Sequence, residues 1–211
     1  MNVEVHAHTL YSGHSILRIE DVARIAKKRC LDVVAITDHN VIRGALDLAK
    51  VFPTIIAEEV SCNEGHVIGL FLREKVEKGP ALEVMDKIRA QGALVMIPHP
   101  FDTMRKEALM REELVSRGDI IEVFNSRVLR QEDNERARKF AVDKGLPMIV
   151  GSDAHTSMEI GRSFIEIDSV DDPRSFMRAL KNAKLHSRRS SVLVHGQTKL
   201  LKLREVFYRG A

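Results

Sequence analysis

The chain of 211 residues is 44% hydrophobic and 30% charged, with a formal net charge of +3. A chain of this length can bury one substantial core, which predicts a single domain over residues 1–211. It holds neither a run of 18 apolar residues nor a basic leader, so no membrane span, membrane partner or secretion is expected. The two cysteines, Cys30 and Cys62, are too few for a disulfide framework, and a cytoplasmic location is expected.

Strand-like and helix-like segments alternate along the chain. Apolar runs rich in Val and Ile have the length of buried strands, and they span residues 3–7, 33–37, 54–60, 94–98, 120–124 and 147–151. Apolar residues recur with helical spacing at 19–26, 81–88 and 137–141, and Asp172-Pro173 is typical of a helix start. The alternation predicts an α/β fold whose parallel strands are joined by helices.

One connection departs from this alternation. Asn63-Glu64-Gly65 separates the strand at 54–60 from another strand-like run at 66–72, and these turn residues are typical of a hairpin. Antiparallel pairing would bring His66 near Glu59.

Potential metal ligands stand at the ends of the predicted strands. In a closed barrel of parallel strands, the carboxyl ends converge on one mouth. His6 and His8 end the first strand, and both imidazoles project to one face because side chains alternate along a strand. The later strand ends carry Thr37-Asp38-His39-Asn40, Glu58-Glu59, Pro98-His99-Pro100, Asn125 and Ser152-Asp153-Ala154-His155. Polar groups gathered in one buried mouth are costly without a cation, so the pattern predicts a metal site.

Each of these residues also has a plain structural interpretation. A histidine between prolines, such as His99, is often bonded to backbone in a rigid turn, and an isolated Asp153 would be a loop cap. Their joint placement at successive strand ends favours the metal site instead. Alternation allows only one of Glu58 and Glu59 to face the mouth.

These motifs, in this order and over almost the whole chain, resemble the polymerase and histidinol phosphatase (PHP) family. The resemblance rests on His6-Ala7-His8, Thr37-Asp38-His39-Asn40, Glu59-Val60-Ser61, His66-Val67-Ile68-Gly69, Pro98-His99-Pro100 and Gly151-Ser152-Asp153-Ala154-His155. It implies a distorted TIM-like (β/α)7 barrel with a trinuclear centre, commonly zinc, manganese or iron, that hydrolyses phosphoesters. Family substrates range from histidinol phosphate to nucleotides and nucleic-acid ends.

The resemblance also implies a division of the ligands. Carried over by position, the three metals would be held by His6, His8, Glu59 and Asp153, by Glu59, His66 and His99, and by His14, His39 and His155. Glu59 would bridge the first two metals. Many family members read Ser-Asp-Gly where this chain has Ser12-Gly13-His14, so the third site here depends on a histidine.

Two or three divalent Zn, Mn or Fe ions suit such mixed imidazole and carboxylate ligands. Hydrolysis by a metal-activated water is expected, with Glu59 and Asp153 as the catalytic carboxylates. Asp38 and Asn125 are expected to orient ligands from behind the centre. Arg43 and Arg127, which follow the second and sixth strands, are candidates for the substrate phosphate, although both could equally be surface arginines.

Several substrate classes fit a barrel of this size. A barrel without an inserted cap domain leaves its mouth accessible to a phosphorylated small molecule, a nucleotide or an oligonucleotide end. An amidohydrolase-like barrel is one alternative, since it also opens with HxH and ends with an Asp, but it often uses a bridging lysine where this chain has Glu59.

A non-catalytic barrel that binds RNA or protein is the other alternative. Its binding segment would be residues 184–211, which hold seven Lys and Arg residues against Glu205 and are expected to be peripheral. Such a segment can attract a polyanion, including nucleic acid. Aromatic residues make up only 5% of the chain, which argues against a base-stacking platform.

Overall fold

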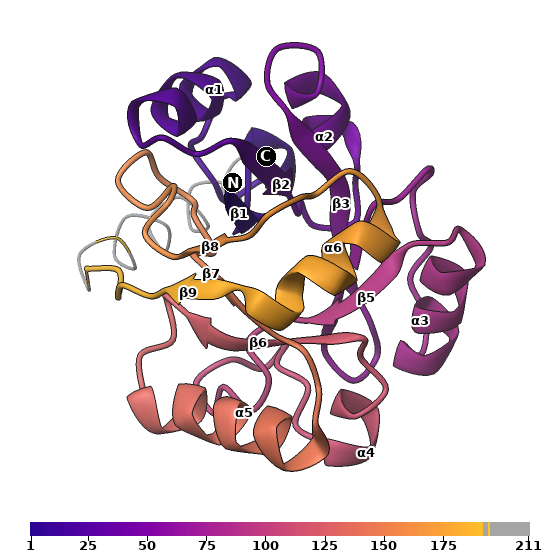
Figure 1. Cartoon of the computed structure of the whole chain (residues 1–211). Helices are drawn as coiled ribbons and strands as arrows, with labels where there is room; N and C mark the ends of the chain where they lie inside the picture. The colour runs from indigo at the N-terminus through magenta and orange to yellow at the C-terminus, as the bar shows by residue number, and fades with distance from the viewer. Residues whose placement is uncertain (192–193, 195–211) are drawn as a thin grey trace, which may run out of the picture.

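The computed structural model describes residues 1–191 and 194, so most of the basic segment expected to be peripheral lies outside the described residues. Within the described part, strands form one sheet in the order β7-β6-β5-β4-β3-β2-β1-β8-β9 (Figure 1). The strands are β1 (Asn2–Ala7), β2 (Val33–Ile36), β3 (Thr54–Ser61), β4 (His66–Leu70), β5 (Leu94–Ile97), β6 (Ile120–Asn125), β7 (Met148–Gly151), β8 (Phe164–Glu166) and β9 (Lys184–His186).

The helices follow the expected order. They are η1 (Leu10–Ser12), α1 (Ile19–Lys28), α2 (Arg43–Leu48), α3 (Ala81–Ala90), α4 (Glu112–Val115), α5 (Gln131–Lys144), α6 (Pro173–Ala179) and η2 (Leu180–Asn182). Asp172 caps α6 by accepting backbone hydrogen bonds from Arg174 and Ser175 at 2.7 and 3.0 Å, which confirms the predicted helix start. The short helices α2 and α4 were not predicted, because neither is long enough to show an apolar period.

The sheet curls into a nearly closed α/β barrel. Parallel pairs β1–β2–β3 and β5–β6–β7 flank β4, which is antiparallel to both of its neighbours. The barrel closes where Ala154, just after β7, accepts the His8 N–H at 2.8 Å and pairs with Ala7. The predicted single-domain barrel is confirmed, and the β3–β4 hairpin is its antiparallel distortion.

Two strands were not predicted. β8 and β9 are three residues each, and they extend the sheet beyond β1, with β8 antiparallel to β1 and β9 antiparallel to β8. Strands this short carry too few residues for alternation to be visible in the sequence.

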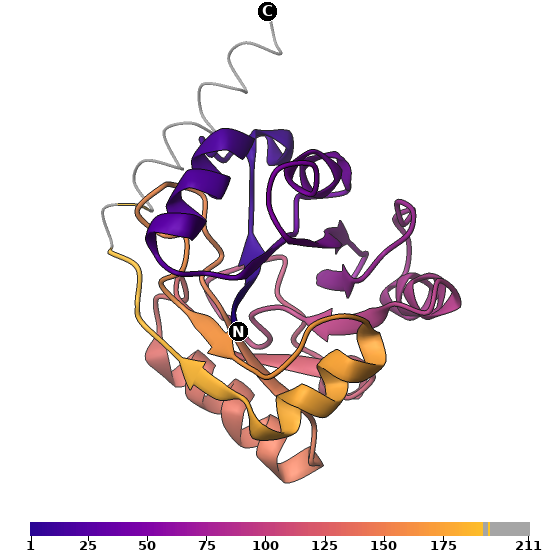
Figure 2. The same cartoon turned by 45° about the horizontal axis from the view of Figure 1, so that its top comes forward.

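One end of the barrel is covered and the other carries the polar strand ends. Phe176 of α6 packs edge-on against Phe71, with ring centroids 5.4 Å apart. Phe71 follows antiparallel β4, so α6 lies against the end opposite to the carboxyl ends of the parallel strands. Figure 2 shows α6 on the side of the molecule away from α1 and α2. Among the described residues, no helix combines the length and apolar character needed to cross a membrane.

Candidate metal centre

The carboxyl ends of the strands bring seven of the expected ligands into three overlapping groups. The groups are His6, His8 and Asp153; His8, His39 and Glu59; and Glu59, His66 and His99. In each group the ligand atoms lie within 4.8 Å of one another. Segments more than a hundred residues apart in sequence therefore present their donor atoms to the same small volume.

The first group together with Glu59 has the dimensions of a four-coordinate site. His8 Nε2 lies 3.2 Å from His6 Nε2, 3.2 Å from Glu59 Oε2 and 3.3 Å from Asp153 Oδ1. His6 Nε2 lies 3.5 and 3.6 Å from the same two carboxylate oxygens. Ligands about 2.0–2.1 Å from a tetrahedral ion are roughly 3.3 Å apart, so these separations fit a transition metal.

Glu59 faces two groups at once. Its Oε2 points toward His6 and His8, while its Oε1 lies 2.9 Å from His66 Nδ1 and 3.1 Å from His99 Nε2. The predicted hairpin brings His66 here, because Ser61 pairs with His66 across β3 and β4. Glu58 points to the other side of β3, where it is buried and accepts the Val76 N–H at 2.9 Å.

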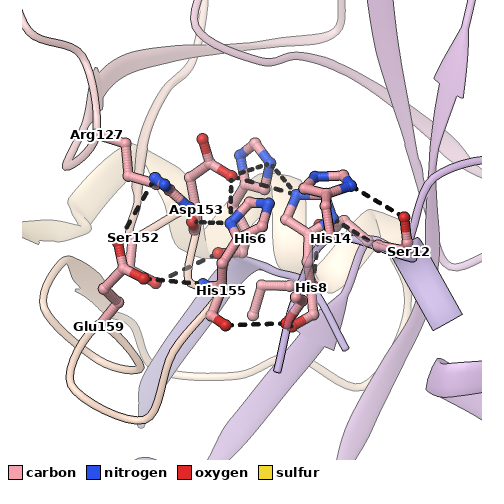
Figure 3. Close-up of polar contacts among 12 residues, drawn as sticks. His6, His8, Ser12, His14, Arg127, Ser152, Asp153, His155 and Glu159 are labelled. Carbon is pink, nitrogen blue, oxygen red and sulfur yellow. Dashed lines mark hydrogen bonds and ion pairs between the residues drawn. The ribbon is translucent and has the colours of Figure 1, made fainter. Parts of the chain in front are cut away.

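His14, His39 and His155 lie beside the first group. The ring centroid of His14 is 4.9 Å from that of His39 and 4.7 Å from that of His155. Figure 3 shows His14 and His155 beside His8. Within the described residues, however, their ligand atoms do not form a group of their own, and His39 Nδ1 is instead 3.5 Å from Glu59 Oε2. The three rings therefore lie close together, but among the described residues they do not form a third ligand group apart from the groups that contain Glu59.

An unsatisfied nitrogen supports a donor set that fits cations. His39 Nδ1, which lies 3.5 Å from Glu59 Oε2, is buried without a hydrogen-bond partner in the described part of the chain. Burial holds the pKa of His39 well below its usual value, and burial together with His8 and Arg127 does the same for the pKa of His155. Neutral imidazoles of this kind keep a lone pair available for a metal.

The two carboxylates in the cluster are ionised. Burial alone would raise the pKa of Glu59, but His39 and His66 outweigh it and hold that pKa well below its usual range. Burial opposes ionisation of Asp153 in the same way, and Arg105 and His6 outweigh it, so its pKa is also well below the usual value. Burial alone would lower the pKa of His6 and His8, but Glu122 and Asp153 outweigh it at His6, and Asp153 and Glu59 at His8, so both pKa values are raised. Carboxylates beside imidazoles are the ligand set that Zn²⁺, Mn²⁺ and Fe²⁺ accept.

Glu122 of β6 supports the cluster from behind, and it was not predicted. Its Oε1 lies 2.9 Å from His6 Nδ1, and its Oε2 accepts the backbone N–H of His99 at 2.7 Å. Asn125 donates from Nδ2 to Glu122 Oε2 at 3.0 Å and to Asp153 Oδ2 at 3.3 Å. Glu122 thus orients two candidate ligands, and Asn125 contacts both Glu122 and the candidate ligand Asp153.

Asp38 contacts the candidate ligand His8 indirectly, through the hydroxyl of Ser12. It accepts hydrogen bonds from the Thr9 backbone N–H and from Ser12 Oγ, both at 2.6 Å. Ser12 Oγ is 3.1 Å from His8 Nδ1. The carboxylate therefore fixes the hydroxyl that contacts the far nitrogen of a ligand histidine.

Three arginines have different relations to the site. Arg127 is buried, lines the cavity and lies 3.5 Å from Glu159 Oε1 through its Nε (Figure 3). Arg43 does not reach the cavity, because it opens α2 with its side chain 61% exposed and pairs with Asp47 at 2.9 Å. Arg105 was not predicted, since loop residues follow no period, yet it lines the cavity and pairs with Asp153 at 2.7 Å.

The cavity above the cluster has a volume of about 670 Å³. Its polar lining includes His14, His39, Glu59, Asp153 and His155, while Met104 and Leu129 add apolar surface. A volume of this size exceeds what a phosphate alone requires and leaves room for the group that the phosphate esterifies.

Comparisons with known proteins agree with this arrangement. Residues 4–91 match the family model described as the PHP domain, and residues 131–185 match one described as PHP-associated. The chain is 35% identical over 198 residues to the uncharacterized protein MJ0417 of Methanocaldococcus jannaschii, covering 86% of this chain and 79% of that protein. The chain belongs to the PHP family. A second M. jannaschii relative, the uncharacterized protein MJ1587, is 37% identical over 142 residues, which cover 60% of this chain and 82% of that protein.

Solved structures share the PHP fold at low identity. A proposed metal-dependent phosphoesterase from Bifidobacterium adolescentis matches with a TM-score of 0.63 and 14% identity, over 90% of this chain and 97% of that one. PsfC from Pseudomonas syringae matches with a TM-score of 0.64 and 16% identity, over 99% and 97%. An amidohydrolase from Chromobacterium violaceum matches with a TM-score of 0.62 and 16% identity, over 89% and 99%. PHP proteins are mostly metal-dependent hydrolases, and the buried clusters here indicate a multi-metal site.

Proposed function

We propose that this PHP protein is a metal-dependent phosphoesterase that hydrolyses a phosphomonoester, a nucleotide or an oligonucleotide end. The observation that carries the proposal is the placement of Glu59, whose two oxygens face separate groups of histidines at 2.9–3.5 Å. A carboxylate shared in this way suits two ions held side by side. Two or three Zn²⁺, Mn²⁺ or Fe²⁺ ions would lower the pKa of water and neutralise charge on the phosphoryl oxygens.

Asp153 is the residue best placed to move the proton. Its Oδ1 lies 3.3 Å from His8 Nε2, and its Oδ2 accepts from Arg105 at 2.7 Å. The carboxylate therefore lines the cavity with a fixed orientation, ionised and in reach of a water attacking at phosphorus. It takes the proton of that water and passes it to the leaving oxygen.

Arg105 and Arg127 recognise the phosphate. Both line the cavity on the side of Asp153 and His155, from the loops after β5 and β6. A guanidinium can hold two phosphate oxygens in parallel hydrogen bonds, which fixes the ester for in-line attack. Arg127 is buried and Arg105 is about three-quarters shielded from solvent, which strengthens these charge-assisted bonds relative to a fully exposed site.

Glu59 is also the observation that argues against amide or lactone hydrolysis. The position between the two ligand groups holds a carboxylate and not the bridging lysine often used by amidohydrolase-like barrels. The likeness to the C. violaceum amidohydrolase, at 16% identity, concerns the fold. A non-catalytic role is disfavoured because each group keeps three donor side chains.

A substrate panel with added Mn²⁺ tests the proposal. The panel holds an aryl phosphate, nucleoside monophosphates, end-phosphorylated oligonucleotides, an anilide and a lactone. We expect phosphate release by the wild-type protein and none by His8→Ala or Asp153→Asn with the fold intact. Unchanged turnover in those variants, or hydrolysis of the anilide or lactone alone, would refute the assignment.

A further inference from the structure

Four arginines gather on the outer wall of the barrel beside β8 and β9. They are Arg29, at the end of α1, Arg162, before β8, and Arg188 and Arg189, after β9. The antiparallel register that pairs Phe164 with His186 continues to bring Arg162 opposite Arg188. Figure 1 shows the end of β9 beside the connection that leads into β8.

Backbone contacts hold this arginine cluster in place. Arg162 donates from Nη1 to the Arg189 carbonyl at 2.8 Å, and the Arg188 N–H donates to Ser163 Oγ at 3.0 Å. Arg29 donates to the carbonyls of Met158 and Ile160 in the β7–β8 connection. These hydrogen bonds are accepted by carbonyl and hydroxyl oxygens, which carry no formal charge.

The arginine cluster forms no close ion pairs. Within the described residues, none of its four members forms an ion pair with a carboxylate, and Arg29, Arg188 and Arg189 are exposed. Partial burial and the positive charges of Arg162 and Arg188 lower the pKa of Arg29, and the opposing effect of the buried Glu4 does not cancel this shift. By contrast, Arg24 on the same helix pairs with Asp21 at 2.7 Å. A bound anion would relieve this repulsion between neighbouring cations.

The arginine cluster continues into the cavity. Arg189 donates from Nη2 to the Leu129 carbonyl at 2.8 Å, and the Ser190 N–H donates to the Ser126 carbonyl at 2.8 Å. Leu129 and Arg127, in the same loop, line the cavity above the candidate metal centre. The arginine cluster therefore contacts the same loop whose Arg127 and Leu129 line the cavity.

We propose that the arginine cluster binds the phosphate backbone of a single-stranded nucleic acid whose terminal phosphate occupies the cavity. The position of that terminal phosphate rests on the proposed function. Four arginines on one surface suit the several phosphates of a nucleic-acid strand better than they suit one small anion. Among the exposed large hydrophobic side chains of the described residues, Tyr11 alone is aromatic, so recognition is by the backbone and independent of base sequence.

The test compares binding and turnover in two matched double variants. Arg162→Ala/Arg188→Ala removes two members of the arginine cluster, while Arg174→Ala/Arg178→Ala removes two exposed arginines of α6 and changes the net charge equally. Fluorescence anisotropy would follow binding of a labelled twelve-nucleotide strand with hydrolysis-resistant phosphorothioate linkages, over a range of salt concentrations. Aryl phosphate hydrolysis by the same proteins, and their thermal melting, would be measured in parallel.

We expect Arg162→Ala/Arg188→Ala to weaken strand binding about tenfold or more at low salt, with Arg174→Ala/Arg178→Ala unchanged. Each lost phosphate contact reduces the slope of log affinity against log salt by about 0.7, so two reduce it by about 1.4. Equal binding by both double variants would overturn the inference. The inference would also be overturned if the wild-type protein bound anionic phospholipid vesicles but did not bind the labelled strand.

The two proposals fail in different ways. If the wild-type protein binds the strand through the arginine cluster but releases no phosphate from any substrate, the proposed function fails and the binding surface stands. If both arginine double variants hydrolyse aryl phosphate, and the Arg162→Ala/Arg188→Ala substitution does not change strand binding, the proposed function stands and the binding surface fails.

Discussion

Arg105 Nη2 lies 2.7 Å from Asp153 Oδ2, so a loop arginine fixes the carboxylate that faces the ligand histidines. Its Nε also pairs with Asp102 Oδ2 at 2.9 Å. The guanidinium therefore has two roles in the proposed reaction, orienting Asp153 and contacting the phosphate.

Replacing Arg105 with alanine should lower kcat/KM for an aryl phosphate by about 100-fold, because a bidentate charge-assisted contact is lost. Arg105→Lys should recover only part of the rate, since an ammonium cannot reproduce the planar fork. Steady-state kinetics would measure both effects. Arg24→Ala, which breaks an exposed Arg–Asp pair, is the matched control and should leave kcat/KM unchanged. A rate in Arg105→Ala equal to that of the control would contradict this role.

Glu122→Gln should weaken metal binding roughly 10- to 100-fold, because the carboxylate that contacts His6 Nδ1 sets the orientation and basicity of that ligand. Titration against a competing chelator would give the affinity. Glu113→Gln, an exposed carboxylate on α4, is the control. Identical affinities in the two variants would show that Glu122 has only a structural role.

Gly151 should not tolerate a side chain. A Cβ at this position would overlap Glu122 Oε1 and lie 2.6 Å from His6 Cβ. We expect Gly151→Ala to lower the free energy of unfolding by roughly 1–3 kcal/mol through overpacking. Gly79→Ala is the control, because its Cβ would approach only Glu83 Oε2, at 3.6 Å. Urea unfolding would measure both, and a Gly151→Ala as stable as Gly79→Ala would be inconsistent with this packing.

The two cysteines should differ in reactivity. Burial, with the charges of Glu64 and Glu59, raises the pKa of the Cys62 thiol to about 12. At pH 8.5 this thiol stays protonated, whereas Cys30 is exposed. Iodoacetamide should therefore modify Cys30 first, and peptide mass spectrometry would show the order. Equal labelling of both cysteines in the folded protein would contradict the burial of Cys62.

The sequence predicts the strand ends of the site because alternation and chain order determine them. His6 and His8 share a face through their spacing of two, and Asn63-Glu64-Gly65 specifies the hairpin that carries His66 to Glu59. These are local patterns, and a barrel converts them into one cluster. For the same reason the alternating strands and helices predict the α/β fold, while the barrel was expected from the resemblance to the PHP family.

Other parts of the site depend on geometry that no local pattern encodes. Glu122 and Asn125 are three residues apart, and they reach the same side because the β6–β7 register shifts between Glu122 and Phe124. Arg105 lies in a loop, where side-chain direction follows from tertiary contacts. Arg43 follows a strand end in the sequence, yet the turn into α2 directs it to solvent.

We propose that histidines and carboxylates from separate strands share several metal ions. Elemental analysis of the folded protein after reconstitution counts these ions. We predict at least two transition-metal equivalents per chain, falling by at least one in Glu59→Gln. A folded protein that binds fewer than one equivalent after exposure to zinc, manganese and iron would show that these side chains do not form a shared metal centre.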